Sequence, residues 1–184
     1  GENPRRHRPG GLVVGVEEAA PAEVAELRRA AAMDDRKDNN PLTVPEQVPP
    51  VGPTDIVGVK KNGVQEGVYR KLRLGKYDAQ DVLDLHRVRL MDARDRVQTF
   101  LVKAHEQGLR SVLISHGKGV HSERPGFLKS YVMHWLEESH LVLAYHSAPQ
   151  NQGGSGATYV LIRKSSQSRQ RNREFFMEAG KQQR

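Results

Sequence analysis

Two residues suited to acid–base chemistry stand at the end of a short apolar run, VLDLH, at residues 82–86. Side chains alternate faces along a strand, so Asp84 and His86 are expected on one face and Leu83 and Leu85 on the other. A carboxylate bonded to one imidazole nitrogen fixes the tautomer and raises the basicity of the other nitrogen. The pair is a candidate general base or acid, able to activate water or a ribose hydroxyl. The sequence leaves open whether Asp84 contacts its own neighbour or another histidine.

A glycine-rich loop follows the next apolar run, and it holds His116, Gly117, Lys118 and Gly119. If the two runs are parallel neighbours, His86 and His116 meet at the same edge of the sheet. His116, Lys118 and the backbone N–H groups are suited to hold phosphate oxygens, and glycines allow close backbone approach. We therefore predict Asp84, His86 and His116 as catalytic residues, acting on phosphodiester bonds.

A second candidate cradle for a ribose or phosphate is GGSGAT, in which Gly153, Gly154 and Gly156 would admit the ligand. Each signal is weak alone. HGKG lacks the spacing and the Lys-Ser/Thr ending of the nucleotide hydrolase phosphate loop, and GGSGAT is also compatible with a simple hairpin connection. All three motifs lie next to predicted strands in a basic protein, so together they are stronger evidence for a phosphodiester site than any one of them alone.

The chain has 184 residues and a formal charge of +7, with seven cationic and two acidic side chains between Arg163 and Arg184. Lysine and arginine attract phosphate backbones whatever their sequence, so we expect nucleic acid, DNA or RNA, as the partner. Arg163 and Lys164 are candidate contacts. A disordered basic tail with no ligand is the alternative interpretation.

The composition excludes several classes of site. The chain has no cysteine, which excludes disulfides, thiolate zinc sites and cysteine nucleophiles. No apolar window is long enough for a membrane span and no leader is recognisable, so we expect a cytoplasmic protein, although a lost leader stays open. One aspartate and scattered histidines do not form the carboxylate cluster of a two-metal nuclease. We predict no metal ligands, with Mg²⁺ at most assisting.

The elements that must position these residues follow from hydrophobic periodicity. Helical spacing is predicted within 63–77, from Leu90 to Gly108 and from Phe127 to Leu136. Strands are predicted within 82–86, within 110–119 before a glycine-rich loop, within 141–148, and within 151–164 after a glycine loop. This order predicts a two-layer α/β sandwich with a mixed, mainly parallel four-stranded sheet. The last two strands need no crossover helix, so they are antiparallel neighbours or the last one runs to the far edge.

Composition also divides the chain into four segments. Residues 1–53 are expected to form an N-terminal arm with a short helix at 21–33 and a proline-rich linker at 41–53. Residues 54–81 form a helical lead-in, residues 82–164 the compact domain, and residues 165–184 a basic tail.

LDLHRVRLMDA, HGKG and GGSGAT, in this order, resemble the three signatures of the Smr (small MutS-related) domain, and KLRLGKY resembles the lead-in of stand-alone bacterial members. The resemblance implies a fold like the C-terminal domain of a translation initiation factor. It implies endonuclease activity, as DNA nicking or RNA cleavage including messenger RNA on collided ribosomes. It assigns cleavage to Asp84 and His86.

The sequence departs from the family pattern at two positions. Arg87 replaces a glycine, where it either closes substrate space or contacts a phosphate, and Asp92 replaces a glutamate. Neither change removes the acid–base pair, so we favour a hydrolytic endonuclease. The alternatives are a non-catalytic module that binds nucleic acid or the ribosome, and a binder of small phosphates or nucleotides.

Overall fold

The computed structural model describes Ala22, Glu26 and residues 38–182, and the chain divides into two units, Gly1–Met33 and Asp34–Arg184. The two described residues of the first unit are helical, and the rest of the helix predicted over 21–33 lies outside the described residues. No helix in the described part of the chain is both long and apolar enough to cross a bilayer.

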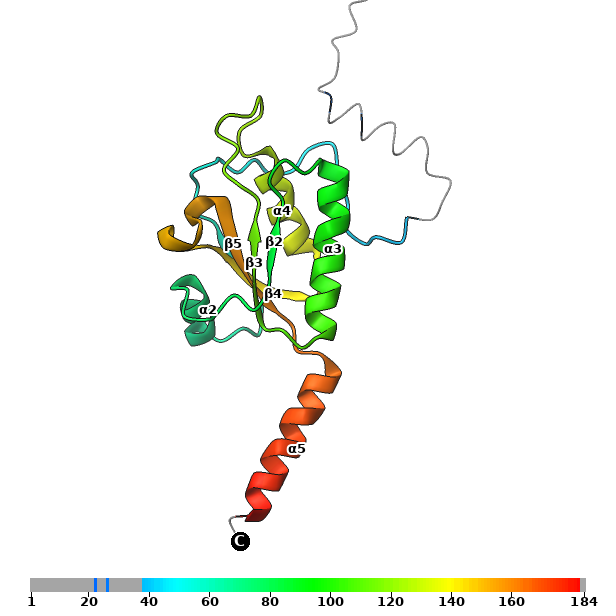
Figure 1. The fold of residues 1–184 in the computed structure, drawn as a ribbon, viewed down its shortest axis with the longest axis vertical. Helices are drawn as coiled ribbons and strands as arrows, with labels where there is room; N and C mark the ends of the chain where they lie inside the picture. The colour runs from blue at the N-terminus through cyan, green and yellow to red at the C-terminus, as the bar shows by residue number, and fades with distance from the viewer. Residues whose placement is uncertain (1–21, 23–25, 27–37, 183–184) are drawn as a thin grey trace, which may run out of the picture. The chain divides into compact units, whose positions relative to one another are not determined.

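The second unit is built on one sheet with the strand order β1–β4–β5–β3–β2 (Figure 1). The strands are β1 (Gly58–Lys60), β2 (Val82–Asp84), β3 (Ser111–Ser115), β4 (Val142–Ser147) and β5 (Ala157–Ile162). Among these described strands, β2 and β3 pair in parallel, and the other three pairs are antiparallel. The mixed α/β class is confirmed, whereas the predictions of four strands and of mainly parallel pairing are wrong.

Both errors have a physical reason. β1 is a three-residue edge strand that pairs with β4, too short to show a period of two in the sequence. β5 lies between β3 and β4 and is antiparallel to both, so β3 and β4, which run in the same direction, are not paired with each other. The antiparallel contact between the last two strands is the first of the two predicted alternatives.

Four helices accompany the sheet in the described part of the second unit: α2 (Glu66–Arg73), α3 (Leu90–Glu106), α4 (Phe127–Glu138) and α5 (Ser166–Gln182). α3 and α4 cover one face of the sheet (Figure 1), and α4 buries Tyr131 and Trp135 in the core. α2 packs on the other face against Tyr159 and Leu161. The predicted two-layer sandwich therefore carries a short helix on its second face.

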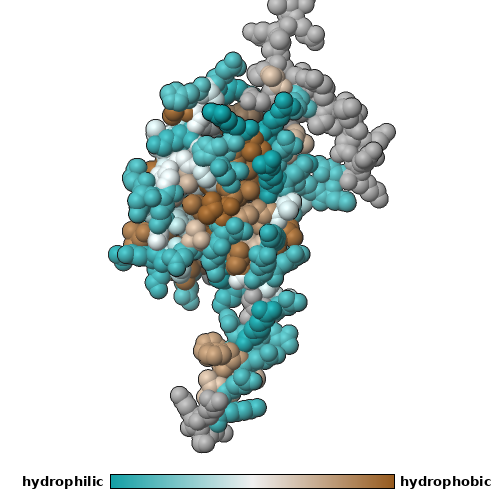
Figure 2. Space-filling model, viewed as in Figure 1, coloured by the Kyte–Doolittle hydropathy of each residue, from teal (hydrophilic) through white to brown (hydrophobic). Residues whose placement is uncertain are grey.

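α2 covers β4 and β5 and leaves part of the same face open over β2 and β3. Paired residues point to one face of a sheet, and the register puts Val82 beside Leu113 and Asp84 beside Ser115. The side chain of Val82 is exposed, and Figure 2 shows hydrophobic side chains gathered over these two strands. We call the surface formed by Val82, Asp84, Leu113 and Ser115 the open strip.

The proline-rich residues 41–53 carry neither helix nor strand, and they are fixed along α4. Trp135 Nε1 donates to the Thr43 carbonyl at 2.9 Å, and the Tyr131 hydroxyl donates to the Pro45 carbonyl at 2.6 Å. Leu42 is buried in the core. The segment therefore contributes to the packing of this unit. The segment boundaries predicted above stay predictions.

Candidate active site

The contact between Asp84 and His86, which the sequence leaves open, is formed at the end of β2. Asp84 Oδ1 accepts the backbone N–H of His86 at 2.9 Å and lies 2.6 Å from His86 Nδ1. The backbone N–H of His86, and then its imidazole, lowers the pKa of Asp84 below its ordinary value. The carboxylate thus holds a proton on Nδ1 and leaves Nε2 as the nitrogen that exchanges one.

Solvent reaches both members of this pair. The side chains of Asp84 and His86 are 72% and 57% exposed, respectively. Asp84 ends the open strip, and His86 follows it at the edge of the sheet where β3 also ends. A large polymer could therefore approach the imidazole without any opening of the fold.

Gly117 forms the floor beneath the imidazole. A Cβ atom at this position would lie 3.0 Å from His86 Nε2, and the backbone has a φ of +77°, which side chains disfavour. Glycine is needed here both for its backbone conformation and for the space that His86 occupies. The VLDLH and HGKG motifs therefore contact each other at His86 and Gly117.

The structure places the third predicted catalytic residue elsewhere. His116 is buried, with Nδ1 2.8 Å from the Gly117 carbonyl and Nε2 2.8 Å from Thr158 Oγ1. A carbonyl only accepts, so Nδ1 donates to it and Nε2 accepts the threonine hydroxyl. Burial lowers the pKa of His116 to about 4, which keeps the ring neutral. Its imidazole does not share the open hollow with His86.

Thr158 is the partner of His116 that sequence reasoning missed. It is fully buried on β5, and its hydroxyl donates a hydrogen bond to His116 Nε2. The available signal was the final threonine of GGSGAT, whose partner could not be read without the antiparallel pairing of β3 and β5.

Gly154 and Gly156 of the third motif support the loop from below. The Gly156 carbonyl accepts the N–H groups of His116 and Gly117 at 3.1 and 2.9 Å. Gly154 N–H donates to the Pro149 carbonyl, and Gly156 N–H donates to the Gly153 carbonyl. These groups are therefore occupied within the protein and are not available to a phosphate.

Two other N–H groups of the loop remain open. Those of Lys118 and Gly119 have no acceptor in the part of the chain that the structure describes. Gly119 has a φ of +67°, and the Lys118 side chain is exposed beside Gly156. The available donor set is thus two amides and one ammonium group, next to the His86 imidazole.

The remaining predicted contacts divide into two locations. Arg87 is exposed immediately after His86, with a φ of +58°, the left-handed region in which glycine is favoured. Arg163 and Lys164 follow β5, whose pairing sets Ala157 beside Ser115 and Leu161 beside Ser111. They therefore lie at the opposite end of the sheet from the acid–base pair. Within the described residues, no three histidine, aspartate or glutamate side chains are grouped as metal ligands.

Comparison with known proteins matches residues 83–163 to the Smr domain. The chain is 44% identical over 116 residues to "Probable DNA endonuclease SmrA" of Escherichia coli (strain K12), covering 62% of each chain. It is 32% identical over 111 residues to "Ribosome rescue factor SmrB" of Pectobacterium carotovorum subsp. carotovorum (strain PC1), covering 60% of this chain and 57% of the relative. The match therefore spans about three fifths of these two curated relatives.

The fold agrees with a solved relative. The crystal structure of YdaL, a stand-alone small MutS-related protein from Escherichia coli, has a TM-score of 0.61 and 39% sequence identity. The match covers 68% of this chain and 96% of YdaL. The predicted likeness to a translation initiation factor stays a prediction. With its three motifs assembled around one sheet edge, the chain belongs to the Smr (small MutS-related) family.

Proposed function

We propose that this chain is an endonuclease that cleaves phosphodiester bonds of nucleic acid at the Asp84–His86 pair. The observation that carries the proposal is the 2.6 Å contact between Asp84 Oδ1 and His86 Nδ1, with both side chains open to solvent. The name of the Escherichia coli relative, a probable DNA endonuclease, supports the same reaction class.

His86 Nε2 takes the proton from the attacking hydroxyl, which belongs to water or to a ribose. The hydroxyl oxygen bonds to phosphorus while the bond from phosphorus to the leaving oxygen breaks, and that oxygen takes up a proton from the imidazolium or from water. Asp84 remains ionised throughout and stabilises the imidazolium. The amides of Lys118 and Gly119 and the Lys118 ammonium group stabilise the negative charge that develops on the phosphoryl oxygens.

His116 acts in this proposal as a positioning residue. Its ring links the Gly117 carbonyl to Thr158, and this link fixes the part of the loop on which His86 rests. Arg87 and Lys118 supply charge to the approaching backbone. Mg²⁺ assistance and the choice between RNA and DNA stay open for the assay below.

The test compares His86→Ala, Asp84→Asn and wild type on matched RNA and DNA oligonucleotides. General acid–base catalysis contributes about 10²–10⁴-fold, so we expect a loss of that order for His86→Ala with binding retained. His140→Ala is the matched control, because His140 is exposed at the turn after α4. Cleavage by His86→Ala at the wild-type rate would refute the site.

A non-catalytic module that binds nucleic acid or the ribosome is the second candidate. Two observations favour it: a relative named as a ribosome rescue factor, and a basic α5 with exposed Phe175, Phe176 and Met177. Salt-sensitive binding without turnover, in chelator and across a Mg²⁺ titration, would select this function over the first.

A further inference from the structure

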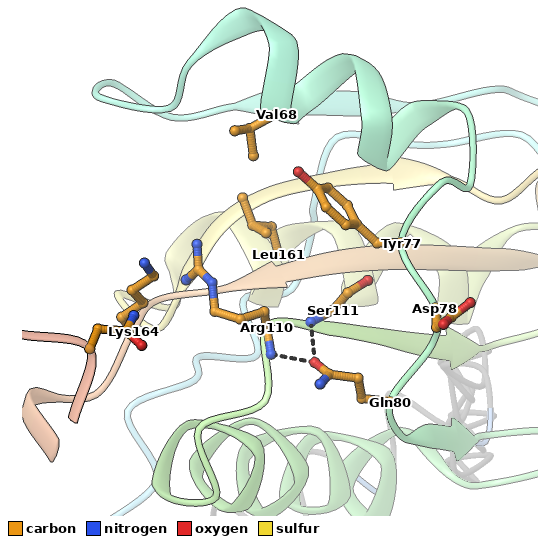
Figure 3. A pocket seen from close by; sticks show the side chains of 9 residues that line it. Val68, Tyr77, Asp78, Gln80, Arg110, Ser111, Leu161 and Lys164 are labelled. Carbon is orange, nitrogen blue, oxygen red and sulfur yellow. Dashed lines mark hydrogen bonds between the residues drawn. The ribbon is translucent and has the colours of Figure 1, made fainter. Parts of the chain in front are cut away.

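A pocket of about 560 Å³ lies beneath α2, at the end of the sheet opposite His86 (Figure 3). It lies within the range of volumes that small-ligand sites have. The site described above uses none of its residues. Its walls come from α2, the segment after it, β3, the C-terminal end of β5 and α5. Its lining residues include Tyr77, Asp78, Arg110, Ser111, Leu161 and Lys164.

One end of the pocket is cationic. Arg110 and Lys164 both face it, and a second hollow of about 420 Å³ shares these two residues and adds Arg163. Burial, reinforced by the charge of Arg169, lowers the pKa of Arg110. An anion seated here would favour the charged form of the guanidinium and so offset this shift, which makes this end suited to a phosphate.

Ser111 supplies an independent sign of a ligand. Its side chain lines the pocket and is 3% exposed, and its Oγ has no hydrogen-bond partner in the described part of the chain. A buried hydroxyl without a partner is costly, and such groups in native proteins require an explanation. The neighbouring backbone is fixed, because Gln80 Oε1 accepts the N–H groups of Arg110 and Ser111 at 2.6 and 3.1 Å (Figure 3).

The other end of the pocket is aromatic and acidic. The Tyr77 ring lies near Leu161 and Val68 and offers a planar surface for stacking, and the Asp78 carboxylate stands at the rim (Figure 3). Stacking on aromatic side chains is how proteins bind unpaired bases, and a carboxylate accepts hydrogen bonds from sugar hydroxyls or base amino groups. Across the pocket, the cationic and aromatic ends match the phosphate and the base of a nucleotide.

We propose that this pocket binds one nucleotide unit of the strand that is cut at His86, several residues from the scissile bond. Phosphate would lie on Arg110 and Lys164, the base on Tyr77, and Ser111 would donate to the ligand. Ser111 and Ser115 point to the same face of β3, about 13 Å apart at 3.3 Å per residue. The open strip joins the two sites. This inference rests on the proposed nuclease function.

The first test measures binding without cleavage. Adenosine monophosphate, with inorganic phosphate as a second probe, is titrated into the wild-type chain and followed by backbone amide chemical shifts. We expect shifts at Ser111 and Tyr77, weaker affinity for phosphate alone, and roughly tenfold weaker nucleotide binding for Lys164→Ala and Ser111→Ala. Lys103→Ala on α3 is the matched charge control. No nucleotide binding, or equal binding by all variants, overturns the pocket.

The second test asks where the nucleotide comes from. With a strand long enough to reach both sites, Lys164→Ala should raise KM more than it lowers kcat, and the increase should be smaller for a dinucleotide. Equal KM values for wild type and variant, with nucleotide binding intact, would assign the pocket to a free nucleotide and overturn the strand path. If no substrate is cut by wild type, the nuclease proposal fails, while the titration still decides the pocket.

Discussion

His116 is a neutral histidine inside a basic protein, and its environment makes stability depend on pH. Its pKa lies near 4 in the folded chain against an ordinary value of 6.5, because burial penalises the charged ring. Between these values the unfolded chain binds a proton that the folded chain does not. Stability contributed by the neutral ring is therefore complete above the ordinary pKa and is lost as pH falls toward the folded one.

We predict that acidification from pH 7 to pH 4 removes about 3 kcal/mol of folding free energy through this residue. Urea unfolding at several pH values gives the slope of the unfolding free energy against pH for wild type and for His116→Gln. The other titrating groups contribute equally to both slopes, so the difference reports on His116. His116→Gln should show the flatter profile. Parallel profiles would mean that His116 is protonated in the fold.

Arg87 occupies a backbone conformation that favours glycine. An L residue at a φ of +58° carries backbone strain of about 1–2 kcal/mol. Glycine removes this strain but loses more conformational entropy on folding, which offsets part of the gain. We predict that Arg87→Gly is more stable by up to about 1 kcal/mol in urea unfolding. Binding of nucleic acid should weaken in the same variant, because one cation beside His86 is lost. A less stable variant would show that Arg87 makes a stabilising contact.

The sequence could suggest the acid–base pair from its two residue types, but the contact depends on the turn after β2, in which the backbone N–H of His86 donates to Asp84 Oδ1. The sequence could not show that His116 is buried, because this depends on the alternation that puts Ser115 on the open strip and turns the next side chain away from it. The bond from that side chain to Thr158 depends on strand pairing, which local sequence does not encode. Glycine content alone also could not show which loop amides are already bonded.

At the scale of elements, the proline-rich segment 41–53 is anchored to the core by Leu42. Leu42 is 1% exposed, whereas Leu74 at the end of α2 is 49% exposed. We predict that Leu42→Ala costs about 2–5 kcal/mol of folding free energy and that Leu74→Ala, as the control, costs less than about 1 kcal/mol. The single tryptophan, Trp135, donates to the Thr43 carbonyl, so its fluorescence reports the detachment directly.

An unchanged unfolding midpoint for Leu42→Ala would instead mean that the segment is dispensable for stability.

The proline pattern of residues 41–53 predicted the absence of a helix, and the backbone agrees. What it could not indicate is docking, because that depends on Tyr131 and Lys129, some 80 residues away along the chain. Lys129 is buried and donates to the carbonyls of Gly52 and Asp55 at 3.0 and 2.5 Å.

At the scale of the molecule, α5 adds charge and apolar surface. Arginines at positions 169, 171 and 173 precede exposed Phe175 and Phe176 on this helix. We predict that replacing the three arginines with glutamine reduces the salt dependence of nucleic-acid binding by about 2–3 in the log–log slope. Phe175→Ser/Phe176→Ser should lower affinity through lost stacking while leaving that slope unchanged.

Binding isotherms at several salt concentrations test both variants. Equal slopes for the arginine variant and wild type would remove α5 from the interface. Periodicity predicted the order of the elements from α2 to β5, because α2, α3, α4 and four strands lie near their predicted residues. It predicted neither the short β1 nor α5, which stands where only a basic tail was expected. The order of the strands in the sheet was not predictable. A short loop between β4 and β5 indicates that these strands are close, but it does not show that β5 lies between β3 and β4.

The place of β5 in the sheet has a consequence for biosynthesis. A growing polypeptide emerges from its first residue onward, yet the strand that joins β3 to β4 is the last of the five to be made. Until Ile162 has left the exit tunnel, both of those strands expose unpaired edges, and the hydrophobic faces cannot close over one another. We therefore expect the sheet of the nascent domain to form late, in one step, when β5 becomes available to pair with β3 and β4.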